Sequence, residues 1–424
     1  MFSRRTAWSL APNALARALE AHRRANRELL DLTASNPTEA GLQYESAAIL
    51  NALADPSALR YRPQPKGLIS ARTAVAEYYR ELSCVPSGRG PQRQSSGPGE
   101  IEVPDVESIV LTVSTSEAYS FVFRLLCDVG DEVLVPSPSY PLFEFLAGLH
   151  DVRLVPYSLL YDQGWHVDVH SLESALTGQS RAIILVHPNN PTGSYIKPGE
   201  RERLNNLCAA HRLALVADEV FLDYLVGENP DCTAASAGKD SGAIPPQNFS
   251  FAFNRDVLTF TLSGISKISG LPQMKLAWIA GSGPAEPVRA ALSRLEVIAD
   301  TYLSLSAPIQ HAAPVLLAQR HGIRLQLLAR VRTNLAELDR QLGGQTLCCR
   351  LAVEGGWYVI LRVPVTHTDE QLAIRLLEER NVLVQPGYFY DFRKDGYPVL
   401  SLITPEAEFK EGTRRILEFV IGNL

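Results

Sequence analysis

The strongest constraint on the fold of this 424-residue chain is an alternation of apolar runs and helical patterns between residues 108 and 280. The apolar runs are short and nearly free of charge, as expected for strands that are buried on both faces of a sheet. Helical segments between them are typical of parallel strands joined by crossovers. We therefore predict a largely parallel α/β sheet. Its strands include SIVLTV, EVLVP, AIILVHP, LALVAD and VLTFTL, and its helices include SEAYSFVFRLLCDVG and PGERERLNNLCAAH.

After residue 305 the pattern changes to that of a smaller α+β domain. A long helical stretch at about 308–343 leads to the apolar run GGWYVILRVP, and a second helix is expected near 368–379. The runs VLVQP and PVLSLIT then predict two more strands. A helix that links two domains favours closure around a ligand.

The N-terminal residues and two polar segments complete the predicted organisation. Residues 13–30 are expected to form an amphipathic helix with Asn13 as its cap. The Pro-, Gly- and Ser-rich segment 86–100 cannot bury much apolar surface, so we expect a flexible insertion there, and residues 228–248 resemble a second insertion. The predicted units are an arm and helix packing with the small domain (1–45), a large domain (46–305) and a small domain (306–424).

Charge, hydropathy and cysteine spacing exclude several classes of protein. A net charge of −6 provides no basic field, so we expect no nucleic-acid partner. No apolar run approaches the ~18 residues that span a bilayer, so we expect no membrane partner. The six cysteines form no CxxC pair, and Cys348 and Cys349 are adjacent, which suits neither a zinc site nor a disulfide framework. We expect a reduced, cytoplasmic protein without a metal site.

Polar residues follow several predicted strands, where an open α/β sheet binds its ligands. In LTVSTSEAYS a strand ends and Ser114, Thr115 and Ser116 open a helix. The free N–H groups and dipole of a helix start favour a phosphate. The spacing from Ser114 to Glu117 is also that of a capping box, and taken alone this segment is explained more simply by capping.

Three further strand ends each allow a binding role and a structural one. Tyr140, in VPSPSYPLF, could stack on a planar ligand or pack as a turn aromatic. Asn190, in HPNNPTG, could donate a hydrogen bond to a ring oxygen or form an Asx-turn. Asp218 ends LALVAD and would be costly if buried unpaired; it could hold a protonated pyridine nitrogen or pair with a neighbouring base.

The segment SGISKISGLPQMKLAWIAG, residues 263–281, places Lys267 among small residues at a strand end. A lysine there can form a Schiff base with an aldehyde cofactor. Each feature is weak by itself. A hydroxyl-rich helix start, an aromatic residue, an asparagine turn, an aspartate and a lysine, in this order on one sheet, are hard to obtain by chance.

The motifs NNPTG and SxxSK, the latter with Lys275 eight residues after Lys267, resemble those of the class I/II aminotransferases, an aspartate aminotransferase-like family of fold-type I enzymes that depend on pyridoxal 5′-phosphate. The resemblance covers about residues 30–410. It implies a mostly parallel, seven-stranded-type sheet between helices in the large domain, and a smaller α+β C-terminal domain. It also implies an amino acid and a 2-oxo acid as substrates, and a homodimer with shared active sites.

The resemblance assigns roles to the residues already singled out. Lys267 would hold the cofactor as a Schiff base and move the proton, Asp218 would pair with the pyridinium nitrogen, and Asn190 would bind the ring 3-oxygen. Tyr140 would stack on the ring. Tyr61, in RYRPQPKG, would reach the phosphate of a neighbouring subunit. The phosphate would otherwise be surrounded by Ser114, Thr115, Ser116, Ser266 and Lys275.

The chain departs from the family pattern at four positions. Ser114 stands where the family usually has glycine, and Lys275 where it has arginine. Phe221 replaces a tyrosine whose hydroxyl faces the ring oxygen, and Tyr224 is a weak candidate to replace it. Ser401 occupies the place assigned to the arginine that binds the substrate carboxylate. The candidate replacements for that arginine, each with an alternative interpretation as a surface residue, are Arg60, Arg62, Arg362 and Arg393.

These features predict an aminotransferase that works by a ping-pong route. The same scaffold supports other chemistry, so a cofactor-dependent lyase, decarboxylase or racemase is the main alternative, and the missing arginine favours it. A non-catalytic sensor of the cofactor is a third hypothesis, although residues 1–30 are too short for a helix-turn-helix domain. Asn36, in ASNPTEAG, falls where the family's N-terminal loop passes the substrate, and is equally suited to a turn.

Overall fold

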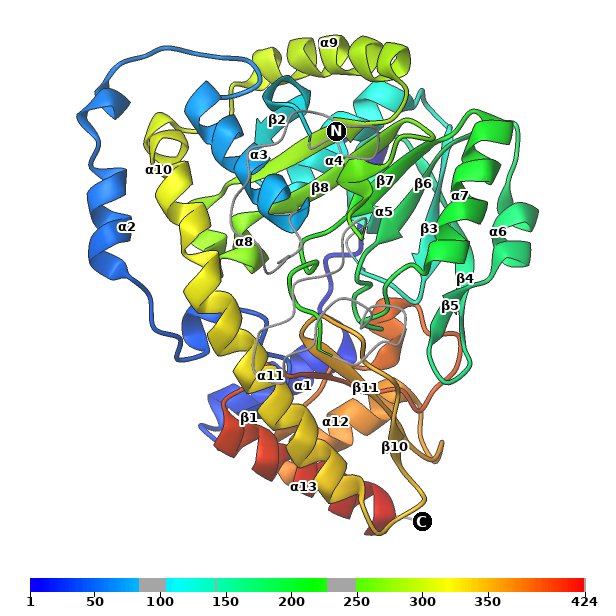
Figure 1. Cartoon of the computed structure of the whole chain (residues 1–424). Helices are drawn as coiled ribbons and strands as arrows, with labels where there is room; N and C mark the ends of the chain where they lie inside the picture. The colour runs from blue at the N-terminus through cyan, green and yellow to red at the C-terminus, as the bar shows by residue number, and fades with distance from the viewer. Residues whose placement is uncertain (84–103, 142, 227–248, 423–424) are drawn as a thin grey trace, which may run out of the picture.

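The computed structural model describes residues 1–83, 104–141, 143–226 and 249–422. The two predicted insertions, 86–100 and 228–248, lie outside the described residues. Figure 1 shows an upper part built around a large sheet and a lower, smaller part of helices and short strands. The chain is thus a two-part α/β protein, as predicted.

The upper part contains an eight-stranded sheet with the order β2-β9-β8-β7-β6-β3-β4-β5. Strands β8, β7, β6, β3 and β4 are parallel, whereas β9 is antiparallel to both of its neighbours and β5 is antiparallel to β4. The sheet is therefore the predicted, mostly parallel one, with the short β5 added at its edge. The bounds are β2 (Ile109–Thr112), β3 (Glu132–Ser137), β4 (Arg153–Tyr161), β5 (Trp165–Val167), β6 (Ser180–Val186), β7 (Ala214–Asp218), β8 (Thr259–Gly264) and β9 (Ala277–Ser282).

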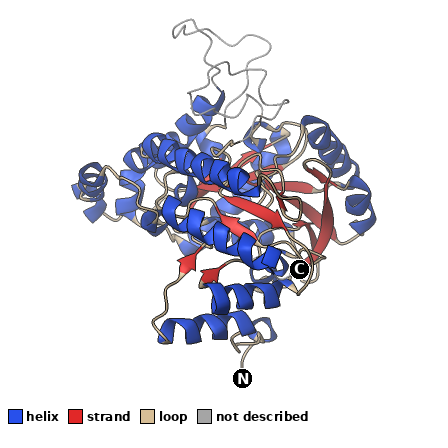
Figure 2. Cartoon of the chain, turned by 90° about the horizontal axis from the view of Figure 1, so that it is seen from below, coloured by secondary structure: helices blue, strands red, loops and turns tan. Residues whose placement is uncertain are grey.

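Helices cover both faces of this sheet, as Figure 2 shows from below. Alternate residues of the buried strands face opposite layers: Ile183 packs in one apolar cluster with Leu204, and Ile184 packs in another with Tyr119. This two-sided burial explains why the strands read as continuous apolar runs. The helices of this part are α2 (Ser46–Leu53), α3 (Ile69–Ser83), α4 (Thr115–Leu126), α5 (Phe143–Gly148), α6 (Val169–Ala175), α7 (Pro198–His211), α8 (Ile265–Ile268) and α9 (Ala285–Tyr302).

The strand β4 was not anticipated from the sequence. Most of its residues are exposed or partly buried, only Tyr157 is fully buried, and Pro156 interrupts the run. A half-exposed strand with a proline lacks the continuous apolar signal by which its neighbours were predicted. Its residues 153–158 nevertheless pair with β3, and residues 159–161 pair with β5.

The lower part contains a three-stranded sheet, β10-β11-β13, and a helical layer. The single helix predicted at 308–343 is two helices that are separated only at Gln319, which itself keeps helical dihedral angles (φ −59°, ψ −24°). The elements of the lower part are α11 (Arg320–Leu342), β10 (Cys349–Arg350), β11 (Tyr358–Arg362), α12 (Asp369–Arg380), β12 (Val382–Leu383), β13 (Val399–Ser401) and α13 (Glu406–Gly422). The preceding helix, α10 (Ala307–Ala318), packs on α2 and α3 of the upper part and leads down to α11 (Figure 1).

The N-terminal helix α1 (Ala14–Arg24) packs on α12. Asn13 caps it as predicted, because its side chain accepts a hydrogen bond from the Ala16 N–H (2.8 Å). The predicted end at residue 30 is wrong. Asn26 takes a left-handed conformation (φ 47°), which ends the helix and leads to β1 (Leu30–Asp31), a strand parallel to β12. Short 3₁₀ helices lie at Arg4–Thr6, Pro37–Glu39, Pro56–Leu59, Val106–Ser108, Phe251–Phe253, Pro272–Met274 and Gly387–Tyr390.

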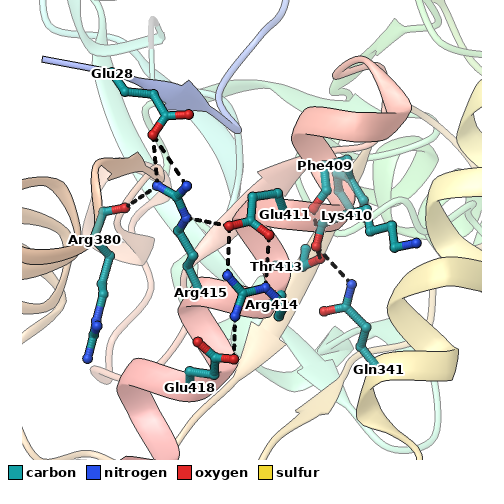
Figure 3. Close-up of polar contacts among 10 residues, drawn as sticks. All are labelled: Glu28, Gln341, Arg380, Phe409, Lys410, Glu411, Thr413, Arg414, Arg415 and Glu418. Atoms are coloured by element: carbon teal, nitrogen blue, oxygen red, sulfur yellow. Dashed lines mark hydrogen bonds and ion pairs between the residues drawn. The ribbon is translucent and has the colours of Figure 1, made fainter.

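An ion-pair network also ties the N-terminal segment to the lower part (Figure 3). Arg415 of α13 pairs with Glu28 (3.3 Å) and with Glu411 (2.7 Å), and it donates to the Arg380 carbonyl at the end of α12 (3.0 Å). One guanidinium thus joins three separate segments.

Two features are absent from the part of the chain that the structure describes. No helix there is both long and apolar enough to cross a membrane. His, Cys, Asp and Glu side chains form no group of three that could hold a metal ion in the same residues.

Candidate active site

The predicted polar residues gather at one edge of the large sheet. Asp218 is the last residue of β7, and Lys267 follows β8 by three residues. Asn190, Tyr140 and Ser114 follow β6, β3 and β2 in the same way. Because these five strands point in one direction, their carboxyl ends meet at one edge.

The Lys267 amine lies against aromatic rings. Its Nζ is 4.9 Å from the centre of the Trp357 ring and 5.6 Å from that of Phe221. It also lies 3.4 Å from the Ser35 carbonyl oxygen. Burial lowers the pKa of Lys267 to about 8, and the Asp218 carboxylate opposes that shift. The neutral, nucleophilic amine is therefore well populated close to neutral pH.

The Asp218 carboxylate is held from two directions. It accepts hydrogen bonds from the Tyr119 hydroxyl (3.1 Å) and from the Val220 N–H (3.2 Å). Burial raises the pKa of Asp218 to about 6, although both hydrogen bonds and the Lys267 charge favour ionisation. Above that pH the site contains a buried negative charge that suits a protonated ring nitrogen.

Turn formation and ligand binding were the two roles considered for Asn190, and the structure separates them between Asn189 and Asn190. Asn189 makes the turn contacts, since its Oδ1 accepts from the Thr192 hydroxyl (3.1 Å) and its Nδ2 donates to the Ser139 hydroxyl (3.2 Å). Asn190 is buried, and its Oδ1 has no hydrogen-bond partner among the described residues. A buried amide oxygen without a partner is costly in a finished fold, which favours a ligand contact for Asn190.

Tyr140 lies partly exposed beside this cluster. Its ring makes an edge contact with Phe143 at 6.1 Å between centroids. Burial raises the pKa of Tyr140 to about 12, and the Asp218 carboxylate adds to the shift. An aromatic ring, a carboxylate, an amide and an amine thus follow or end neighbouring strands at one edge of the sheet, a set of groups that suits a planar, aldehyde-bearing heterocycle.

Ser114 caps the hydroxyl-rich helix start, but the full capping box is absent, because Glu117 accepts from the Val113 N–H and not from the Ser114 N–H. The Ser114 oxygen accepts from the Glu117 N–H (3.1 Å), and the Glu117 carboxylate accepts from the Val113 N–H (2.9 Å). The Ser114 oxygen is therefore a structural acceptor, while its O–H hydrogen can still be donated. Thr115 and Ser116 lie half-buried in the first turn of α4, where N–H groups are free for an anion.

The other predicted phosphate residues are placed differently from one another. Ser266 is half-buried next to Lys267 in α8. Lys275 is exposed, but the hydrogen bond from the Ile265 N–H to the Leu276 carbonyl (3.0 Å) places its loop beside the start of α8. Tyr61 is 84% exposed and contributes nothing to the site of its own chain.

The substituted positions have clear structural consequences. Phe221 is buried against Trp357, with 5.1 Å between ring centroids, and brings no hydroxyl to the site. Tyr224 does not replace it, because its hydroxyl donates to the Lys267 backbone carbonyl (2.6 Å). The Asn36 side chain accepts from the Thr38 N–H (3.1 Å), so its turn role is present.

Three aromatic residues of the site were missed by the sequence analysis. Tyr119 holds Asp218, Trp357 lies under the Lys267 amine, and Tyr358 packs edge-on against Phe221 at 6.2 Å. Tyr119 follows Ser116 by three residues, so its place on one face of a helix start was a usable signal. Trp357 and Tyr358 come from the lower part, and only the tertiary fold brings them here.

Comparison with known proteins agrees with this arrangement. A family profile described as aminotransferase class I and II matches residues 27–400. The chain belongs to this family. The aminotransferase is 28% identical to the alanine aminotransferase of Mycobacterium tuberculosis over 93% of its own length and 86% of that protein. It is 26% identical to the glutamate-pyruvate aminotransferase of Haemophilus influenzae over 88% and 86% of the two chains.

Solved structures confirm the fold. The alanine aminotransferase from Pyrococcus furiosus superposes with a TM-score of 0.83 at 19% identity, covering 100% of both chains. A single mutant of the Thermus thermophilus aspartate aminotransferase gives 0.74 at 22% identity, covering 98% of each chain. The predicted fold-type I architecture of the aminotransferase is thus confirmed.

None of the candidate replacements for the missing arginine contacts Lys267 or Asp218 through an interaction found among the described residues. Arg362 is the last residue of β11 and lines a surface hollow with Lys394. Arg60, Arg62 and Arg393 are exposed.

Proposed function

We propose that this aminotransferase binds pyridoxal 5′-phosphate at the sheet edge and moves an amino group between an amino acid and a 2-oxo acid. The observation that carries the proposal is the position of the Lys267 amine and the buried Asp218 carboxylate, which follow or end the adjacent parallel strands β8 and β7 at one edge of the sheet. When bound, the cofactor supplies an aldehyde that condenses with amines and a ring that withdraws electrons.

The side chains of the chain itself supply positioning and proton transfer. Lys267 gains and loses a proton near neutral pH, as a general acid–base group must. Asp218 keeps its negative charge above about pH 6 and holds the ring nitrogen proton. The rings of Trp357 and Phe221 keep water from the amine, which strengthens electrostatic contacts there.

The named relatives suggest which substrates to try first. Alanine with 2-oxoglutarate, and glutamate with pyruvate, are the pairs that correspond to a glutamate-pyruvate aminotransferase. A panel of other amino donors extends the search, because the replaced carboxylate arginine makes the substrate-binding residues of this chain unlike the family pattern.

The test is a half-reaction followed by absorbance. Purified protein is saturated with the cofactor and mixed with each amino donor alone. We expect conversion to the amino form of the cofactor, and reversal by a 2-oxo acid. Release of pyruvate and ammonia would instead identify a β-lyase, release of carbon dioxide a decarboxylase, and change of configuration a racemase. Cofactor binding without turnover of any donor would support the sensor hypothesis.

The assembly and compartment belong to the same proposal. We propose a cytoplasmic homodimer in which Tyr61 of each subunit reaches the site of the other. Leu59 and Tyr61, which are 90% and 84% exposed, support this because they lie in one short segment, and neighbouring exposed apolar side chains mark interaction surfaces.

A further inference from the structure

The position of Ser401 is best understood through its strand partner. In the antiparallel pair β11–β13, Ser401 lies directly opposite Tyr358. Directly opposed residues of two antiparallel strands project to the same face, so both side chains point the same way. On that face the Ser401 hydroxyl donates to the Ala34 carbonyl. The backbone N–H of Ser401 donates to the Leu32 carbonyl (2.7 Å).

Tyr358 reaches the same segment beside the reactive amine. Burial raises the pKa of Tyr358, and an interaction with the Ser35 side chain opposes that shift; the Ser35 carbonyl lies 3.4 Å from Lys267 Nζ. The centre of the Phe221 ring lies 5.6 Å from Lys267 Nζ and 6.2 Å from the centre of the Tyr358 ring. Tyr358 therefore lies close to the Lys267 amine, with the Phe221 ring in contact distance of both.

No described cation occupies that face. Val399 and Ser401, the two residues of β13 that share it, are neutral and buried. Arg330 approaches the loop after β13, but it donates to the Ala40 and Ile403 carbonyls (3.3 and 3.4 Å) and pairs with Glu406. Arg362 ends β11, four residues and roughly 13 Å beyond Tyr358 along the strand.

We propose that Tyr358, with Ser35 beside it, binds the α-carboxylate of the amino-acid substrate through neutral hydroxyl donors, in the place for which the family uses an arginine. This inference rests on the proposed aminotransferase function and names the group that recognises its substrate. Burial raises the pKa of Tyr358, so its phenol stays protonated and remains a donor at neutral pH. A neutral site favours a carboxylate over an uncharged isostere less strongly than a guanidinium fork does.

The experiment compares the wild-type holoenzyme with Tyr358→Phe and Tyr157→Phe. The control removes a hydroxyl of another buried tyrosine, which donates to the Ile184 carbonyl (2.9 Å) away from the amine. Initial rates are measured for L-alanine, L-glutamate and L-phenylalanine and for their α-amides. Because a hydrogen bond to a charged group is lost, we expect Tyr358→Phe to raise KM for the amino acids about tenfold, with kcat changed less than about twofold.

Selectivity and cofactor spectra complete the test. We expect the wild-type kcat/KM for an amino acid to exceed that for its amide by no more than about tenfold. Tyr358→Phe should lower this ratio of kcat/KM values. Tyr157→Phe should change neither KM nor the ratio. An unchanged KM in Tyr358→Phe would overturn this inference but leave the proposed aminotransferase function standing. A shift in the absorbance band of the cofactor would also overturn the inference, because it would mean that the Tyr358 hydroxyl contacts the cofactor ring. A wild-type enzyme that accepts none of the donors would refute the proposed function as well.

Discussion

At the scale of single residues, the amine of Lys267 makes the clearest prediction. Its pKa is lowered from 10.5 to about 8 by burial, so the neutral form that attacks an aldehyde predominates above about pH 8. Attachment of pyridoxal 5′-phosphate to the cofactor-free protein should speed up from pH 6 to about 8 and then level off. Stopped-flow absorbance measures the rate. A rate that keeps rising to pH 10 would mean that the amine behaves as an exposed lysine.

The chemistry of the site could be predicted where it depends on residue type and order. Lys267, Asp218 and Asn190 follow or end strands whose carboxyl ends share one edge of the sheet. Predicting these strands from the sequence therefore also predicted that the three residues lie close together. The choice between capping and binding at Ser114, and between Asn189 and Asn190 as the turn former, depends on hydrogen-bond geometry that spacing does not contain. Tyr358 depends on the register of two strands in the other part of the chain.

At the scale of elements, the first turn of α4 gives a prediction for Ser114. Its side chain caps the helix by accepting the Glu117 N–H. Ser114→Ala should lower the free energy of unfolding by about 1 kcal/mol, whereas Ser114→Gly should cost only a few tenths. Urea denaturation of the three proteins measures this. Equal loss in both variants would show that the hydroxyl does not act as a cap.

The network around Arg415 gives a second prediction at this scale. Its contact with Glu28 is mostly exposed, so a double-mutant cycle with Arg415→Met and Glu28→Gln should give a coupling below about 1 kcal/mol. Salt at molar concentration should reduce this coupling energy. Hydrogen bonds from Arg414 and Arg415 lower the pKa of Glu411 from 4.5 to about 2, so the contribution of these pairs should persist above pH 4.5 and disappear toward pH 2. A coupling that salt leaves unchanged would contradict this electrostatic account.

Element boundaries were less predictable than element types. The helix pattern over residues 13–30 continues past Arg24 in the sequence, yet the left-handed Asn26 ends the helix. The strand β4 was missed because its residues are half-exposed and include Pro156. Both outcomes were decided by tertiary packing, which local periodicity reflects only where a face is fully buried.

At the scale of the whole molecule, the exposed apolar residues near Tyr61 predict a stable dimer. Sedimentation of the holoenzyme should give twice the 46.6 kDa of the chain. Leu59→Glu, which places a charge on a 90% exposed leucine, should favour monomers and lower activity by at least about tenfold if the site is shared. Val129→Glu is a matched control at another exposed apolar position (81%). A fully active monomer would contradict the shared site.

The central claim is that one amine, at Lys267, holds the cofactor. The most direct measurement is borohydride reduction of the protein saturated with pyridoxal 5′-phosphate, followed by digestion and mass spectrometry. We predict one cofactor-derived adduct per chain, on the peptide that contains Lys267. An unmodified Lys267, or an adduct on Lys275 in its place, would contradict the account.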